Sequence, residues 1–142
     1  IYKTLDLTEE ALFEDMAKGF MLSIDVAHAF HPNYVDQCDI TNRPVLGRGL
    51  ALKQACSQSS AGHAEAVAGI KGLRDEKTIP YQLYVNRSDI KGGSTLGSMA
   101  SAITPIRTMD LGVALLAMHS ARETMGASDQ KALADLVTAF FA

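Results

Sequence analysis

The chain has 142 residues and a mass of 15.2 kDa, the size of one domain, with 47% hydrophobic and 20% charged residues. This composition excludes a disordered or collagen-like chain, and no apolar run approaches the roughly 18 residues that span a bilayer. Thirteen basic and 16 acidic residues give a net charge of -3, and the scattered basic residues argue against a nucleic-acid partner.

The chain contains two cysteines, Cys38 and Cys56, which lie apart and form no paired-cysteine motif. They predict neither a disulfide framework nor a thiolate zinc site, and a reducing cytoplasm fits this usage best. The chain begins with Ile1 in place of an initiator methionine and enters a helical pattern within a few residues. We therefore expect it to be a segment of a longer protein.

The first predicted elements are a helix over residues 8–19 and a short buried strand over 20–24. Thr8 is a suitable N-cap for the helix, whose apolar residues recur at helical spacing. The apolar strand stops at Asp25, so we expect this carboxylate at the end of a strand, where active sites of open α/β sheets collect. A long loop over 31–47 follows, because the segment is rich in Pro, Asn, Asp and Gly.

The remainder alternates short apolar segments with helical patterns, which indicates α/β layering in one domain without internal repeats. An apolar run over 115–118 ends on His119, and a helix with a single apolar stripe begins at Ser128. A turn-rich segment covers 89–97. The other predicted elements are strands over 50–55, 81–86 and 106–111, the last closing at Gly112, and helices over 61–74 and 98–103.

Residues 23–34 form the strongest candidate for chemistry. Asp25, His28 and His31 fall within one short stretch at the mouth of a predicted strand. Carboxylate and imidazole are ligand types that hold zinc or another divalent first-row metal. A histidine beside an apolar segment is, however, more often a hydrogen-bonded structural residue, so spacing alone leaves both interpretations open.

Two further candidates carry the same kind of ambiguity. A position at the end of an apolar run would fix the His119 ring as a metal ligand requires, but a buried imidazole bonded to a backbone carbonyl is the alternative. The glycine-rich segment 86–97 could bring its backbone close to a substrate or could be a tight turn at the sheet edge. It lacks the P-loop ending and the dinucleotide fingerprint, so it does not indicate a nucleotide site, and the chain has no nucleophile elbow.

Taken together, these segments resemble the C-terminal half of the catalytic domain of the aspartyl aminopeptidase and aminopeptidase I family, which are cytosolic dinuclear zinc exopeptidases. The resemblance is carried by His-Pro-Asn-Tyr at 31–34, Asn-Arg-Pro at 42–44, the 87–97 loop and Ala-Met-His-Ser at 117–120. It covers most of the chain. It implies a three-layer α/β fold, a zinc-exopeptidase-like sheet with flanking helices, present as a partial domain over residues 1–142.

The resemblance also implies roles for individual residues. Asp25 matches the family aspartate that binds one zinc, and His119 matches the histidine that binds the other. His31 falls in the motif with a structural role. The residues matched to substrate contacts are His28, Lys53, Gly92 and Gly93. The implied cofactor is zinc, with two ions in each complete active site and other divalent metals as an option.

Two features depart from the family pattern. Beyond its lysine the family has an Arg-Tyr pair whose tyrosine touches substrate, where this chain has Ser59 and Ser60. In the family, the first zinc histidine, the bridging aspartate and the Glu-Glu pair that supplies the general base all lie upstream of this segment. One carboxylate and one imidazole fall short of the three protein ligands of catalytic zinc, so we expect the chain alone to be metal-poor and inactive.

The leading hypothesis is that the parent protein is a cytoplasmic metalloaminopeptidase that removes single N-terminal residues, acidic or neutral, through a zinc-activated water. Its partners would be the peptide, the upstream part of the same catalytic domain and further copies of itself, because family members assemble into dodecamers. The alternative is a catalytically inactive relative that keeps the fold for oligomer assembly. A third hypothesis treats the glycine-rich loop as an anion-binding module.

Overall fold

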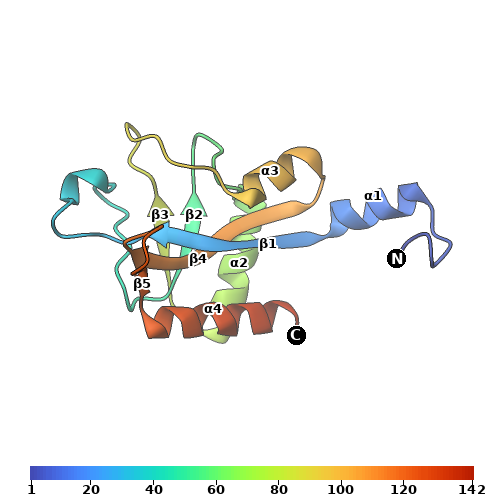
Figure 1. The fold of residues 1–142 in the computed structure, drawn as a ribbon. Coiled ribbons are helices and arrows are strands. Elements are labelled where there is room, and N and C mark those ends of the chain that lie inside the picture. The colour runs from blue at the N-terminus through green and yellow to red at the C-terminus, as the bar shows by residue number, and fades with distance from the viewer.

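A computed structural model describes residues 1–142 and contains a five-stranded mixed sheet with helices on both faces (Figure 1). The strands are β1 (Phe20–His28), β2 (Leu50–Gln54), β3 (Tyr81–Val85), β4 (Arg107–Leu116) and β5 (Thr124–Met125). The helices are α1 (Glu9–Lys18), the 3-10 helix η1 (Val35–Gln37), α2 (Ala64–Lys77), α3 (Leu96–Ile103) and α4 (Ala127–Phe140). The strand order is β1-β4-β2-β3, with β5 paired to β4. β4 is parallel to β1 and antiparallel to β2, and β2 is parallel to β3.

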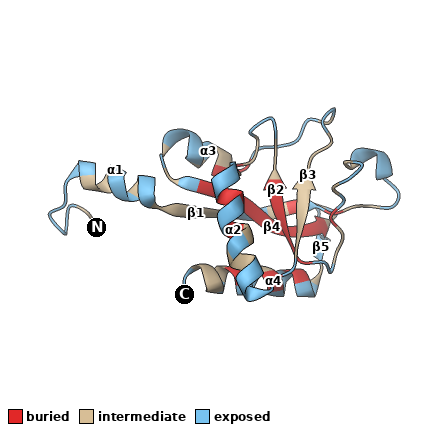
Figure 2. Cartoon of the chain, turned by 180° about the vertical axis from the view of Figure 1, so that it is seen from behind, coloured by how far each residue is buried: buried red, intermediate tan, exposed pale blue.

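The hydrophobic core lies between the sheet and the helices α2 and α4. Met109 and Leu111 of β4 are fully buried there against Ile70 and Leu136. Because side chains alternate between the faces of a strand, Asp110 points to the opposite face, where α3 packs on β1 and β4. Figure 2 shows the buried residues gathered in β2 and β4 at the centre of the molecule. The predicted α/β sheet with flanking helices is confirmed.

α1 projects from the body of the molecule and has no buried residue (Figure 1). Its N-cap forms as predicted, since the Ala11 N–H donates a hydrogen bond to Thr8 Oγ1 at 3.1 Å. Of the apolar side chains that predicted the helix, Phe13 is 53% exposed, whereas Leu12 and Met16 are partly covered. The helix therefore leaves part of its apolar surface, including Phe13, open to solvent.

The structure corrects the predicted ends of two strands. β1 continues to His28, so Asp25 lies within the strand and not at its end. The predicted strand 106–111 and the apolar run 115–118 belong largely to one strand, β4, in which Gly112 pairs with Asp25. Gly112 does not close the strand, because its missing side chain lets two backbones meet: a Cβ there would collide with the Asp25 carbonyl oxygen.

The other predicted elements are confirmed with shifts of a few residues at their ends. The helix predicted over 61–74 begins later and ends at Lys77, because Thr78 adopts a left-handed conformation that stops it. The loop predicted over 31–47 contains only the single turn of η1. None of the helices has both the length and the apolar character needed to cross a membrane.

Asp129 is a fully buried carboxylate in the first turn of α4 that fixes the loop before β2. Its two oxygens accept hydrogen bonds from the Gly47 and Gly49 N–H groups, both at 2.7 Å. Gly49 has a φ of 95°, in the left-handed region that favours glycine. The bonds determine where the chain enters β2, the strand that contains Lys53.

We expect Asp129→Ala to lower the free energy of unfolding by about 2–4 kcal/mol, because the buried Gly49 N–H and the partly buried Gly47 N–H lose a charged acceptor. Urea denaturation measures the change. The matched control is Asp135→Ala on the same helix, where the carboxylate is exposed and the expected change is below about 0.5 kcal/mol. Equal losses in the two variants would contradict this role for Asp129.

Candidate metal and substrate site

Asp25 and Lys53 meet on the sheet face that is turned away from α2 and α4. Asp25 lies beside Gly112 of β4, and Ala51 of β2 lies on the other side of the same glycine. Lys53 is two residues further along β2 and on the same face. Its Nζ donates to Asp25 Oδ2 at 3.0 Å, diagonally across β4. Since glycine has no side chain, Gly112 leaves this path open.

The Asp25–Lys53 pair keeps Asp25 ionised. The Lys53 side chain is 6% exposed and the Asp25 side chain 46% exposed. Burial raises the pKa of Asp25, but hydrogen bonds from the Val26 N–H and from Lys53, with the charges of Lys53 and His119, outweigh it and hold the pKa below its usual value. Asp25 therefore presents a carboxylate that is anchored on one side and open to solvent on the other.

His119 lies in the turn that follows β4, and its φ of 67° is unusual for a residue other than glycine. Its backbone N–H donates to Glu123 Oε1 at 2.5 Å. The residue is exposed, which contradicts the alternative of a buried imidazole bonded to a backbone carbonyl. Its charge acts on the pKa values of both Asp25 and His28, so the three side chains share one electrostatic neighbourhood.

Asp25 and His119 offer the donor types that zinc prefers, a carboxylate oxygen and an imidazole nitrogen. The chain contains no group of three or more His, Cys, Asp and Glu side chains that could hold a metal ion. A catalytic zinc takes three protein ligands. The donor set therefore fits zinc in chemical kind but not in number.

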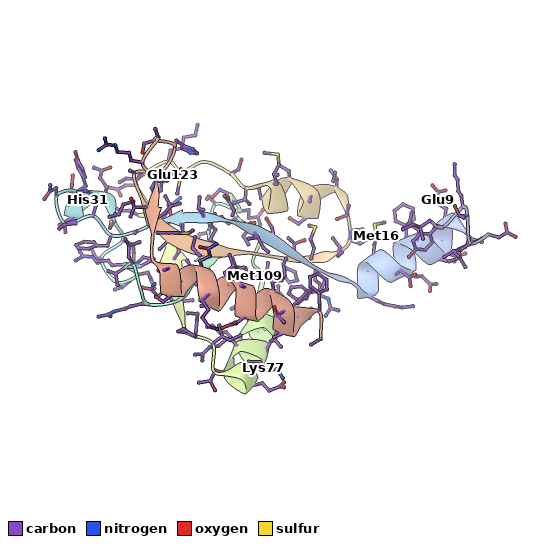
Figure 3. The ribbon with its side chains drawn as sticks, turned by 60° about the horizontal axis from the view of Figure 1, so that its bottom comes forward. Glu9, Met16, His31, Lys77, Met109 and Glu123 are labelled. Atoms are coloured by element: carbon purple, nitrogen blue, oxygen red, sulfur yellow. The ribbon has the colours of Figure 1, made fainter.

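A cavity of about 570 Å³, here called the His28 pocket, lies at the carboxyl ends of β1, β3 and β4. One wall comes from the loop after β1 and the other from the glycine-rich segment. Burial lowers the pKa of His28, and the charges of His119 and Lys53 lower it further, so its imidazole is mainly neutral near pH 7. Figure 3 shows His31 and Glu123 at this end of the molecule, far from Glu9 of α1.

The two predicted glycines differ in their surroundings. Gly92 lines the His28 pocket, and a Cβ at this position would collide with the side-chain amide of Asn86. Gly93 does not line the pocket, and a Cβ there would meet only open space. His31 is held locally, since its Nδ1 accepts from the Asn33 N–H at 3.2 Å and its ring lies 5.0 Å from that of Tyr34.

Ser60, which stands where the family has its tyrosine, lies apart from the His28 pocket. It lines a separate hollow between the loop after β2 and α3. Its neighbour Ser59 accepts a backbone hydrogen bond from Thr95 at 3.0 Å. His28 and Gly92 thus line the His28 pocket, whereas Asp25, Lys53, His119, Ser60 and Gly93 do not. Asp25 is paired with Lys53 and lines a separate hollow beside the N-terminus of α3.

Asp110 is a residue of this face that the sequence analysis did not assign to the site. It is fully buried, and its Oδ2 accepts from the Ala61 N–H and, at 2.5 Å, from Thr95 Oγ1. These bonds tie the loop after β2 and the N-cap of α3 to β4. The available signal was an acidic residue in the middle of an otherwise apolar strand, which must have partners to be buried.

The sequence profile of the family described as Aminopeptidase I zinc metalloprotease (M18) matches residues 2–141. The chain belongs to this family. It is 44% identical over 126 residues to a probable M18 family aminopeptidase 2 of Clostridium novyi, covering 89% of this chain and 29% of that protein. It is 39% identical over 139 residues to aspartyl aminopeptidase 4 of Saccharomyces cerevisiae, covering 98% of this chain and 28% of that protein.

Solved structures show the same relationship. The chain matches a protein in the cryo-EM structure of the Ape4 and Nbr1 complex with a TM-score of 0.91 and 35% identity, over 98% of this chain and 27% of that one. It matches the mApe1 dodecamer of S. cerevisiae with a TM-score of 0.79 and 28% identity, over 97% of this chain and 30% of that one. The expected partial M18 fold is confirmed, and the chain spans under a third of the length of each of these relatives.

The close contact at Gly112 predicts that Gly112→Ala will destabilise the protein by about 3 kcal/mol or prevent folding, because the new methyl group overlaps the β1 backbone. Gly72→Ala is the matched control. Its Cβ would meet nothing within 4 Å on the exposed side of α2, so stability should rise by up to about 1 kcal/mol. Thermal unfolding of both variants checks the contrast, and a neutral Gly112→Ala would contradict the close approach.

Asp39 gives the pocket wall a defined pH dependence. Hydrogen bonds from the Asn42 N–H at 2.7 Å, from the Thr41 hydroxyl at 2.8 Å and from the Thr41 N–H at 3.0 Å lower the pKa of Asp39 strongly. Because the folded-state pKa is depressed, the loop's stabilisation is present above the unfolded value of about 4 and is lost as pH falls toward the folded value. NMR titration of the Thr41 and Asn42 amides should therefore give a midpoint well below pH 4. A midpoint at or above 4, or the same titration in Asp39→Asn, would contradict this prediction.

Proposed function

We propose that the protein containing this chain is a zinc metalloaminopeptidase that releases single N-terminal residues, and that this chain supplies part of its active site. The observation that carries the proposal is the carboxylate of Asp25, which Lys53 anchors at 3.0 Å and whose pKa Lys53 and the charge of His119 help to lower. The His28 pocket at the carboxyl ends of β1 and β4 supports it. Membership of a zinc metalloprotease family supports it. A cytoplasmic location, expected from the cysteine usage, is part of the same proposal.

Asp25 and His119 are the proposed zinc ligands of this chain, each completing the shell of a different ion. Bound zinc would lower the pKa of a water molecule and polarise the scissile carbonyl. Within the chain, Lys53 and the Val26 N–H orient the Asp25 carboxylate by hydrogen bonds of 3.0 and 2.7 Å. The remaining ligands and the general base belong to parts of the protein outside these residues, and no catalytic base is assigned here.

The peptide substrate is proposed to bind at the His28 pocket. Burial and nearby charges lower the pKa of His28, so its imidazole is mainly neutral near pH 7 and has one nitrogen that donates and one that accepts a hydrogen bond. Lys53 lies outside the pocket lining, paired with Asp25. Gly92 belongs to the pocket wall, where a side chain would collide with Asn86, and Gly93 extends the same loop. Acidic and neutral N-terminal residues both remain candidate substrates.

The rest of the catalytic domain is the proposed partner of β1. This nine-residue strand pairs only with β4, so its other edge offers free N–H and C=O groups. Ile24 on this strand is 49% exposed, and α1 next to it is unburied. A long apolar edge of this kind is normally covered. The length of the M18 relatives leaves room for a segment that adds a strand here.

A homo-oligomer is the second proposed association. One matched structure is a dodecamer of mApe1, and this chain covers 30% of that protein. The rival function, an inactive relative that serves assembly, draws on the replacement of the family's Arg-Tyr pair by Ser59 and Ser60 and on the distance of Ser60 from the His28 pocket. The two hypotheses differ in whether the zinc ligands affect peptide hydrolysis.

The test uses the complete open reading frame that encodes this chain. Asp25→Ala and His119→Ala should each lower the release of N-terminal residues about a thousandfold and reduce zinc content from about two to about one ion per subunit. Activity is measured on peptides with N-terminal Asp and Leu, and zinc by mass spectrometry of the purified protein.

The matched controls are Asp135→Ala and His63→Ala, which remove an exposed carboxylate and an exposed imidazole distant from the site. Both should keep activity and zinc within about twofold of the wild type. Full activity in Asp25→Ala or His119→Ala would remove the metal assignment. A wild-type protein that binds zinc without hydrolysing any peptide would favour the assembly role.

A further inference from the structure

The His28 pocket has two walls that come from distant parts of the sequence. The first wall is the loop after β1, including η1, and the second is formed by residues 84–92. At its far end the loop is pinned by the Gln82 side chain, which exchanges two hydrogen bonds of 2.9 Å with the Val45 backbone. The tip of the loop, which faces the opening, depends on other contacts.

Arg87 supplies the side-chain contact at this tip. Its Nε and one terminal nitrogen bind the Asp89 carboxylate in a fork, at 2.7 and 2.8 Å. The other terminal nitrogen donates to the Asp36 carbonyl oxygen in η1. Next to it, Cys38 and Asn86 form an isolated antiparallel backbone bridge. One guanidinium thus joins the loop tip to the glycine-rich segment.

The geometry of this contact suits arginine and not lysine. A guanidinium offers donors in a fixed plane, so it can hold a carboxylate with two nitrogens and still donate in a third direction. All three nitrogens of Arg87 are engaged within the chain. A substrate carboxylate would have to displace Asp89 to reach it, which makes Arg87 a poor ligand for substrate.

We propose that Arg87 is a positioning residue of the His28 pocket, one that straps the loop tip at Asp36 to the glycine-rich segment and thereby sets the width of the pocket for the substrate side chain. The substrate part of this inference rests on the proposed function. The Arg87 side chain is 40% exposed and that of Asp89 64% exposed, so the pair contributes little to global stability. Its loss should therefore open the pocket without unfolding the protein.

Cys38 provides a direct probe of the strap, which is the set of Arg87 hydrogen bonds to Asp36 and Asp89. Cys38 forms the backbone bridge to Asn86 between the two walls, lines the pocket and is only partly exposed. The experiment uses the complete protein with Cys56→Ser, and with any further cysteine outside this chain replaced. The rate at which a disulfide reagent labels Cys38 is then measured at pH 8. Arg87→Lys should raise this rate about tenfold, and Asp89→Asn should raise it similarly, because each removes the fork.

Arg107→Lys is the matched control, since Arg107 also donates to a backbone carbonyl, that of Lys18, at 3.1 Å and far from the pocket. It should leave the labelling rate unchanged. The melting temperatures of all variants should lie within about 2 °C of that of the wild type. A labelling rate in Arg87→Lys within twofold of the wild type would overturn the strap.

Kinetics test the substrate part. Arg87→Lys should raise KM about tenfold for a peptide with a large N-terminal residue such as Leu, with kcat and zinc content within about threefold of the wild type. A general structural defect would lower kcat and the active fraction for every substrate alike. Faster labelling of Cys38 with unchanged KM would overturn the role in substrate binding. A wild-type protein without peptidase activity would instead reject the proposed function, while the labelling result still decides whether the strap exists.

Discussion

The ion pair between Lys53 and Asp25 is the contact on which the candidate site depends, and it depends in turn on the order of the sheet. Asp25 lies on β1 and Lys53 on β2, with β4 between them. A shift of one residue in either pairing would turn one of the two side chains toward the core of α2 and α4. Met109 and Leu111 of β4 pack against those helices, which determines which face of the sheet each β4 residue points to. Gly112 therefore lies on the opposite face, the one that carries the ion pair.

The unequal burial of the pair suits the proposed role of Asp25 as a metal ligand. The Lys53 ammonium is enclosed and has one anionic partner, so it cannot move away without leaving a buried charge unpaired. Asp25 is half exposed and keeps part of its carboxylate open. The buried ammonium fixes the orientation of the Asp25 carboxylate through one oxygen, and the exposed part of the carboxylate stays accessible to a metal ion. The pair is thus better understood as an orienting device than as a source of stability.

Local signals in the sequence predicted most elements, and non-local pairing explains the errors. Thr8 and the apolar spacing after it specify α1 within the segment itself. Gly112 was interpreted as a strand end because a glycine that ends a strand and a glycine that admits a neighbouring backbone look identical in one sequence. The neighbour, Asp25, is far away along the chain. Asp25 and His119 were candidates because each follows an apolar run, and the family resemblance assigned them to two different zinc ions. The parallel pairing of β1 and β4 sets Asp25 beside Gly112 and His28 beside Leu115, a few residues before His119, and no local pattern encodes this register.

Three features of the chain lack a partner within it, and all three bear on the proposal that it is part of a larger catalytic domain. The chain offers one proposed ligand for each zinc ion where catalytic zinc needs three, β1 has one neighbour where an interior strand has two, and α1 has no buried residue. An inactive assembly piece would explain the uncovered strand and helix. It would give no reason for a buried ammonium to hold Asp25 ionised beside His119, since replacing such a pair by apolar residues costs little or adds stability. The charged pair is therefore the part of the structure that favours chemistry over assembly.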